Sequence, residues 1–186
     1  MRCSTSAGPN EYYEVSDGHL SPGERPPQRA NYITPAGYAL MRERYELLFG
    51  KERPALVEVI SWAAGNGDRS ENGDYIYGRK KLREIDRELG HLSRRMKSAK
   101  IIDPAQQTDR GKVYFGATVT IVDQNDVERT VTLVGEDEAD ASAGRISWRS
   151  PMAHALKGAA VGDVRRVTLP SGVMEQEILA VSYPER

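Results

Sequence analysis

The chain has 186 residues, of which 28% are charged and 39% are hydrophobic, and its formal net charge is -1. This length leaves room for one or two domains with a sizeable core. The single cysteine, Cys3, excludes a disulfide framework and a cysteine-ligated zinc site. No apolar run approaches the length of a membrane span, and the N-terminus lacks the apolar stretch of a signal peptide, so we expect a soluble, cytoplasmic protein.

The first feature along the chain is a proline-rich segment, residues 1–30, with prolines at positions 9, 22, 26 and 27. It has no apolar periodicity and cannot bury enough surface to offset the entropy lost on ordering. We therefore expect a disordered leader, for which the sequence indicates no role.

A long helical pattern follows the leader. Thr34 is a suitable N-cap, and Pro35 fits the first helical turn, where its missing N–H is not needed. Pro54 disturbs helical geometry, so we expect a kink between Gly50 and Arg53. Apolar residues recur with the spacing of a coiled-coil seam at Tyr38, Met41, Tyr45 and Leu48, and again at Leu56, Val59, Ile60 and Ala63.

A second arm repeats this pattern after a short turn. Two such arms joined by few residues pack antiparallel, because only that arrangement buries both seams. Residues 31–105 are thus predicted to form a helical hairpin, whose first arm is about 45 Å long at 1.5 Å per residue. The second seam comprises Tyr75, Gly78, Leu82, Ile85, Leu89, Leu92, Met96 and Ala99.

The turn at the far end of the hairpin, residues 67–75, contains three carboxylates at every third position: Asp68, Glu71 and Asp74. One short turn can direct Asp68 and Glu71 at the same point. Converging carboxylates suit Mg²⁺, which takes one or two protein oxygens and keeps its other positions for water and substrate. Acid-rich turns also serve as solvated helix caps, and capping is an equally good interpretation of Asp74.

Beyond a linker at residues 106–110 the period changes to that of β-strands. Short β-branched segments occur at residues 113–115, 117–122, 129–134, 145–148, 164–169 and 175–181. Ser150 and Pro151 can cap and begin one short helix. Residues 111–186 are therefore predicted to form a small antiparallel sheet with one helix, which makes the whole chain α+β.

Several motifs resemble those of the bacterial Gre transcript-cleavage factors, and GreB more than GreA. The first is Gly-Asp-Arg-Ser-Glu-Asn-Gly-Asp-Tyr at residues 67–75, followed by Tyr77 and Arg-Lys-Lys-Leu-Arg-Glu-Ile-Asp at residues 79–86. Matching segments continue at residues 111–117, 150–156 and 161–164. The resemblance covers about residues 31–183, with the motifs in the family's order.

The resemblance implies a factor that binds RNA polymerase and rescues backtracked complexes. A C-terminal domain of the FKBP-like fold would dock at the rim of the polymerase secondary channel, and the hairpin would enter the channel. Asp68 and Glu71 match the family's essential acidic pair, which would act on Mg²⁺ shared with the polymerase, with no cofactor bound by the factor alone. The residues expected to shape the tip or approach the RNA are Ser70, Asn72, Asp74 and Tyr75.

One departure from the family is Gly73, where alanine is common. Glycine within a helix costs about 0.5–1 kcal/mol relative to alanine, so the second arm could begin with a looser turn.

The expected protein is an accessory factor rather than an enzyme, because the polymerase would perform the two-metal hydrolysis. The partners would be RNA polymerase and the 3′ end of the nascent RNA, and we expect a monomer that does not bind membranes. The alternative is a non-cleaving regulator of the secondary channel, against which the retained Asp68 and Glu71 argue. An independent metal nuclease is disfavoured, since two carboxylates on a turn form no pocket.

The second arm is basic: residues 79–100 contain nine Lys or Arg and three acids. Such charge can simply keep an outer helix face soluble, but a net of six exceeds that need, so we favour attraction to RNA or polymerase. The tyrosines of the seams are interpreted as packing residues, and Trp62 is left without a role. The predicted basic patch comprises Arg79, Lys80, Lys81, Arg83 and Arg87.

Overall fold

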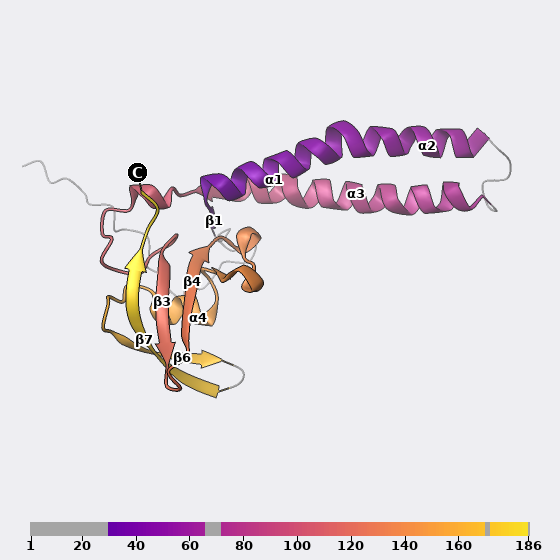
Figure 1. Ribbon diagram of the computed structural model, residues 1–186. Helices are drawn as coiled ribbons and strands as arrows, with labels where there is room; N and C mark the ends of the chain where they lie inside the picture. The colour runs from indigo at the N-terminus through magenta and orange to yellow at the C-terminus, as the bar shows by residue number, and fades with distance from the viewer. Residues whose placement is uncertain (1–29, 66–71, 170–171, 186) are drawn as a thin grey trace, which may run out of the picture.

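The computed structural model describes residues 30–65, 72–169 and 172–185. A long helical hairpin projects from one end of a curled β-sheet (Figure 1). Most of the predicted leader, residues 1–29, and residues 66–71, which include the first five residues of the predicted tip, lie outside the described residues.

The first arm of the hairpin consists of α1 (Pro35–Leu47), a π-helical turn (Leu48–Glu52) and α2 (Arg53–Gly65). Thr34 is the N-cap of α1, and its side chain accepts a hydrogen bond of 3.0 Å from the backbone N–H of Gly37. In the π-helical turn the backbone N–H of Arg53 bonds to the carbonyl of Leu48, five residues earlier. The predicted kink before Pro54 takes this form, and the arm changes direction there (Figure 1).

The π-helical turn also changes which residues face the second arm. The spacing that ends at Leu48 would continue through Val59 and Trp62 if the helix were regular. A π turn holds about one residue more than an α turn, which rotates the following residues by about 100°. Ile60 and Ala63 are accordingly buried, whereas Val59 is 51% exposed. The prediction that Val59 belongs to the seam is therefore wrong.

The second arm, α3 (Gly73–Ser98), packs along both helices of the first arm. Its approach to α2 is closest at Gly78, where an added Cβ would lie 2.6 Å from Cγ1 of Ile60. The predicted seam residue Ala99 follows the helix and begins β2 instead. The apolar core of the hairpin consists of Leu48, Ile85 and Leu89, with Tyr45, Leu56 and Leu92 packed against them.

At the base of the hairpin, β1 (Asn31–Ile33) pairs in parallel with β2 (Ala99–Ile101). This two-stranded sheet joins the start of the first arm to the end of the second. A 3₁₀ turn at Pro104–Gln106 then leads into the C-terminal part.

The C-terminal part is a five-stranded sheet in the order β5-β4-β3-β7-β6. All neighbours are antiparallel except β5, which pairs in parallel with β4, so the prediction of an entirely antiparallel sheet is wrong at this edge. The strands are β3 (Thr118–Asp123), β4 (Glu128–Val134), β5 (Arg145–Ser147), β6 (Val164–Leu169) and β7 (Gly172–Ser182).

One short helix, α4 (Pro151–Leu156), covers the sheet, and Ser150 caps it as predicted, through a 3.2 Å bond from the N–H of Ala153. The core beneath the helix includes Val119, Ile121, Leu156 and Ile178, all fully buried. The α+β fold, with a helical hairpin followed by a sheet and one short helix, is confirmed. Among the described residues, no helix is both long and apolar enough to cross a membrane.

Candidate functional site

The tip of the hairpin is shaped by Asn72. Its side-chain oxygen accepts bonds of 3.1 and 3.2 Å from the backbone N–H groups of Asp74 and Tyr75, which caps α3. Its side-chain nitrogen donates a bond of 2.9 Å to the carbonyl of Ala63 in α2. Asn72 thus fixes the end of one arm against the other, next to the acidic turn.

The structure describes two of the other predicted tip residues, Asp74 and Tyr75. Asp68, Ser70 and Glu71 lie outside the described residues. Asp74 is exposed in the first turn of α3, where Asn72 rather than Asp74 is the cap, and Tyr75 is half-buried in the seam. Among the described residues, no group of three or more His, Cys, Asp or Glu side chains could hold a metal ion.

The position of Gly73 is open. It is exposed, and a Cβ added there would meet nothing within 4 Å of it among the described atoms. Packing against the described atoms therefore does not require glycine at this position.

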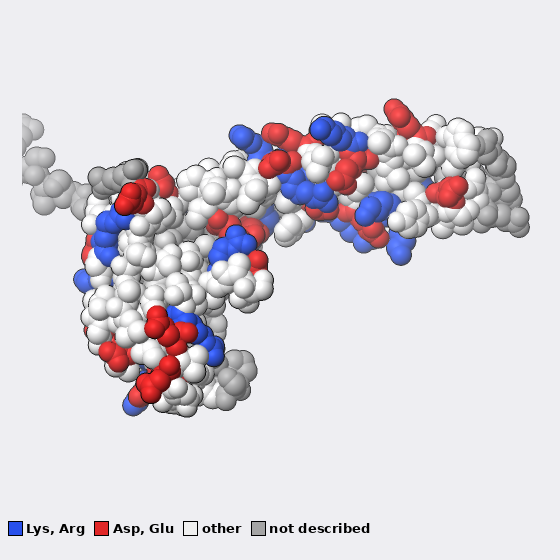
Figure 2. All heavy atoms as spheres, viewed as in Figure 1, with Lys and Arg blue, Asp and Glu red and all other residues white. Residues whose placement is uncertain are grey.

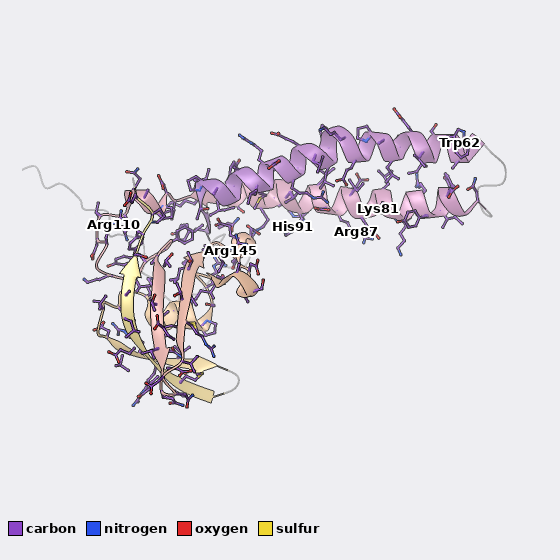
Figure 3. The ribbon with its side chains drawn as sticks, in the orientation of Figure 1. Trp62, Lys81, Arg87, His91, Arg110 and Arg145 are labelled. Atoms are coloured by element: carbon purple, nitrogen blue, oxygen red, sulfur yellow. The ribbon has the colours of Figure 1, made fainter. Side chains whose placement is uncertain are left out.

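The predicted basic patch lies on exposed positions of α3, and Lys81 and Arg87 are visible there in Figure 3. Lys81 approaches Glu84 at 3.8 Å. No salt bridge within the described part of the chain involves the other four patch residues: Arg79, Lys80, Arg83 and Arg87.

The acids of α3 are used differently from its cations. Asp86 binds Arg53 and Glu88 binds Arg44, each at 2.8 Å, so both acids join the two arms. Six cations of α3 have no salt bridge to a described residue: Arg79, Lys80 and Arg83 in its outer half, and Arg87, Arg94 and Lys97 in its inner half.

Two exposed aromatic residues also lie near the tip. Trp62 on α2 is 68% exposed and Tyr77 on α3 is 69% exposed; Trp62 is labelled at the outer end of α2 in Figure 3. The sequence patterns indicate no role for Trp62, and Tyr77 belongs to a predicted motif only. In a regular helix the spacing of the first arm would place Trp62 in the seam. Its exposure can be predicted only when the π-helical turn is taken into account.

A cluster of charged residues joins the base of the hairpin to the sheet, through the acidic run Glu136–Glu138. The guanidinium of Arg95 lies 2.9 Å from Glu136 and 2.8 Å from Asp137. Arg149 binds the same Glu136 at 2.9 Å and the carbonyl of Ala30 at 3.1 Å. Burial lowers the pKa of Arg95, but hydrogen bonds to Asp137 and Glu136 outweigh it, so the pKa is raised overall.

Glu138 completes this joint. Its carboxylate accepts hydrogen bonds from the N–H of Thr34 at 2.9 Å, from the hydroxyl of Thr34, and from the N–H of Gly135 at 3.1 Å. A Cβ on Gly37 would collide with the Glu138 side chain. The sequence shows this run only as an acidic cluster, and its structural role becomes visible only when its basic partners are brought to it.

A cavity of about 650 Å³ opens between the linker and the sheet, beside α4. Lys100 and Lys157 contribute to its wall, and burial lowers the pKa of Lys157. The indole N–H of Trp148 is buried without a hydrogen-bond partner in the described structure. The aromatic lining is formed by Tyr32, Phe115 and Trp148, whose rings contact one another at 4.6 to 6.5 Å between centroids.

A second hollow, of about 610 Å³, lies at the elbow between the hairpin and the sheet. Its lining includes Met41, His91 and Arg145, the last two of which are labelled in Figure 3. Side chains of both signs are mixed on the visible face around the elbow, whereas the described outer end of the hairpin is largely uncharged in this view (Figure 2).

Comparison with known proteins gives matches along nearly all of the described chain. The family model "Transcription elongation factor, N-terminal" matches residues 31–101, and "Transcription elongation factor, GreA/GreB, C-term" matches residues 107–183. Transcription elongation factor GreB of Neisseria meningitidis serogroup B is 46% identical over 153 residues, which cover 82% of this chain and 94% of that protein. GreB of Yersinia pestis is 42% identical, over 83% of this chain and 90% of that protein.

Solved structures of similar proteins were also found. GreA factor homolog 1 (Gfh1) of Thermus thermophilus is 22% identical, with a TM-score of 0.39, over 82% of this chain and 99% of that chain. The transcription elongation factor GreA/GreB from Nitrosomonas europaea is 29% identical, with a TM-score of 0.37, over 51% of this chain and 79% of that chain.

Proposed function

Since the chain belongs to the GreA/GreB family of transcription elongation factors, we propose that it binds RNA polymerase and stimulates cleavage of the 3′ end of backtracked nascent RNA. The hairpin tip enters the secondary channel, and arrested complexes restart after cleavage. The observation that carries the proposal is the position of Asp68 and Glu71 in the chain, between the ends of two helices that project far from the sheet. Such a hairpin can deliver two carboxylates into a narrow channel.

The chemistry follows from the residue types at the tip. Two carboxylates three residues apart offer the small number of protein oxygens that Mg²⁺ accepts. Mg²⁺ held jointly with the polymerase would activate water and stabilise negative charge on the phosphate. Asp68 and Glu71 would hold the ion and orient the attacking water, and Glu71 would accept a proton from that water. The polymerase performs the hydrolysis, so the factor is an accessory protein rather than an enzyme.

Positioning is divided between the two parts of the molecule. The C-terminal part docks at the rim of the secondary channel, with the aromatic cavity beside α4 as the candidate contact. Four cations without a salt bridge to any described residue, Arg79, Lys80, Arg83 and Arg87, attract the hairpin to RNA and to acidic protein surfaces. The factor acts as a monomer in the cytoplasm, where it meets the polymerase.

A transcript-cleavage assay on stalled, backtracked elongation complexes tests this function. Asp68→Asn and Glu71→Gln are each expected to reduce stimulated cleavage by at least about a hundredfold, the scale of losing a group that acts on the transition state. Polymerase binding is expected to change less than about twofold, because docking energy comes mainly from other contacts. Asp74→Asn is the matched control, since it removes one negative charge from the same turn without touching the acidic pair.

Normal cleavage by both variants would refute the assigned chemistry. Binding without any cleavage by the wild-type protein would instead identify a non-cleaving regulator of the channel.

A further inference from the structure

The exposure of two large aromatic side chains beside the tip needs a physical reason. Trp62 and Tyr77 each expose more than two thirds of their surface, and the ring contacts found within the described residues include neither of them. Tryptophan and tyrosine in such positions are typical of binding surfaces.

The backbones of Trp62 and Tyr77 lie at nearly the same height along the hairpin. The close contact between Ile60 and Gly78 fixes the register of the two arms. From that level Trp62 is two residues nearer the tip and Tyr77 is one residue nearer, which corresponds to about 3 Å and about 1.5 Å. Their backbones therefore differ by only about 1.5 Å in height.

The seam spacing also assigns Trp62 and Tyr77 to the same flank of the hairpin. Each stands one position before a seam residue, and so does Lys81. Arg44 and Glu88 also stand one position before a seam residue, farther down the two arms, and their side chains meet in an ion pair of 2.8 Å. Positions of this kind on opposite arms thus share one flank, because the helices face each other and run in opposite directions.

This arrangement is built into the first arm. Without the π-helical turn Leu48–Glu52, the seam spacing would place Trp62 between the arms. π-Helical turns are rare and frequently occur at functional sites. The turn buries Ala63 instead and moves the indole ring to the surface.

We propose that the flank formed by Trp62, Tyr77 and Lys81 binds single-stranded RNA by stacking on its unpaired bases. Exposed aromatic rings combined with nearby cations are the usual means of holding unpaired nucleic acid, because every base has a face on which a ring can stack. Lys80 and Lys81 supply positive charge within one turn of Tyr77. That this RNA is the displaced 3′ segment rests on the function proposed above, whereas the stacking itself does not.

Fluorescence of the free protein tests the stacking directly. The chain contains two tryptophans, so Trp148→Phe leaves Trp62 as the only reporter, and circular dichroism checks that this variant is folded. Single-stranded RNA is expected to quench the fluorescence in a saturable manner, and an abasic oligonucleotide of the same length is expected to quench it much less. Tyr77→Ala should weaken the apparent RNA affinity about fivefold, as loss of one stacked ring predicts. Equal quenching by both oligonucleotides, or none, would overturn the proposal.

Cleavage assays place the stacking in its functional context. Trp62→Ala should slow stimulated cleavage about tenfold, and Trp62→Phe, which keeps a ring, less than about threefold. When the displaced nucleotides are abasic, Trp62→Ala and Trp62→Phe should give the same rate of stimulated cleavage. If Trp62→Ala lost as much affinity for polymerase without RNA as for the complex that contains RNA, Trp62 would contact protein. That result would overturn the RNA assignment. If the wild-type protein stimulates no cleavage, the proposed function fails, and the fluorescence titration still decides the stacking.

Discussion

The base and the tip of the hairpin use charge in opposite ways. At the base, Arg95 and Arg149 are paired with the acidic run Glu136–Glu138, and the contacts are 2.8 to 2.9 Å long. Toward the tip, Arg79 and Lys80 are exposed and have no salt bridge to any described residue. Charge at the base therefore fixes the direction in which the hairpin points, while charge near the tip remains available to a partner.

The largest expected effect is at the base. Arg95→Ala removes the cation that binds Glu136 and Asp137 and leaves two neighbouring acids without it. We expect the free energy of unfolding to fall by about 2–3 kcal/mol, the usual cost of losing hydrogen bonds to charged groups in a half-buried site. Chemical denaturation measures this change. Arg87→Ala, on the same helix but exposed, is the control and should change the free energy of unfolding by less than about 0.5 kcal/mol. Equal effects of the two changes would remove the contrast between base and tip.

The next effect concerns the packing of the arms near the tip. Gly78→Ala brings a methyl group to 2.6 Å from Ile60, and overpacking of this kind costs about 1–3 kcal/mol. Thermal unfolding should report the loss. In combination with Ile60→Ala, which removes the Cγ1 atom of the close contact, the double variant should lose less than the sum of the two single losses. Additive losses in the double variant would show that the close contact is not the cause.

Reversal of exposed positive charges near the tip should leave folding intact. The triple substitution of glutamate for Arg79, Lys80 and Arg83 is expected to weaken association with elongation complexes about tenfold or more at low salt. The reason is that exposed charges act over about 10 Å at 0.1 M salt. Binding titrations at two salt concentrations measure this. Wild-type affinity should fall as salt rises, and the reversed variant should show a flatter dependence. Equal salt slopes would contradict electrostatic attraction by this patch.

The smallest effect is expected at Gly73. Alanine there meets no described atom within 4 Å and favours the helical conformation, so we expect a gain of about 0.5 kcal/mol in the free energy of unfolding. Chemical denaturation again reports the change. The comparison variant is Gly65→Ala, at the end of the opposite arm, where an added Cβ also meets no described atom within 4 Å. A loss of stability at Gly73 would mean that the turn requires glycine.

Much of the fold could be predicted because it depends on local periodicity. The second arm follows its seam up to Ser98, since a 26-residue amphipathic helix repeats the same signal many times. Thr34 and Ser150 could be identified as caps because their hydrogen bonds are made within three residues. Local rules of this kind need no knowledge of the rest of the chain.

Features that depend on contacts between distant segments could not be predicted. β1 and β2 have three residues each, which is too short for a period, and their parallel pairing joins segments 68 residues apart. The run Glu136–Glu138 has the composition of a solvated turn until Arg95 and Arg149 are placed beside it. At the tip, Asn72 could be selected from its motif, but its bond to Ala63 across the two arms could not.

The π-helical turn Leu48–Glu52 shows that two properties of the hairpin can vary separately: how far it extends, and which side its outer end presents. Removing one residue from this turn would shorten the arm by only about 1.5 Å, yet it would turn the outer end by about 100°. Adding a whole heptad to a regular stretch would extend the arm by about 10 Å and turn it by only about 20°. Insertions of different lengths can therefore adjust how far the hairpin extends and which side it presents, each almost independently of the other.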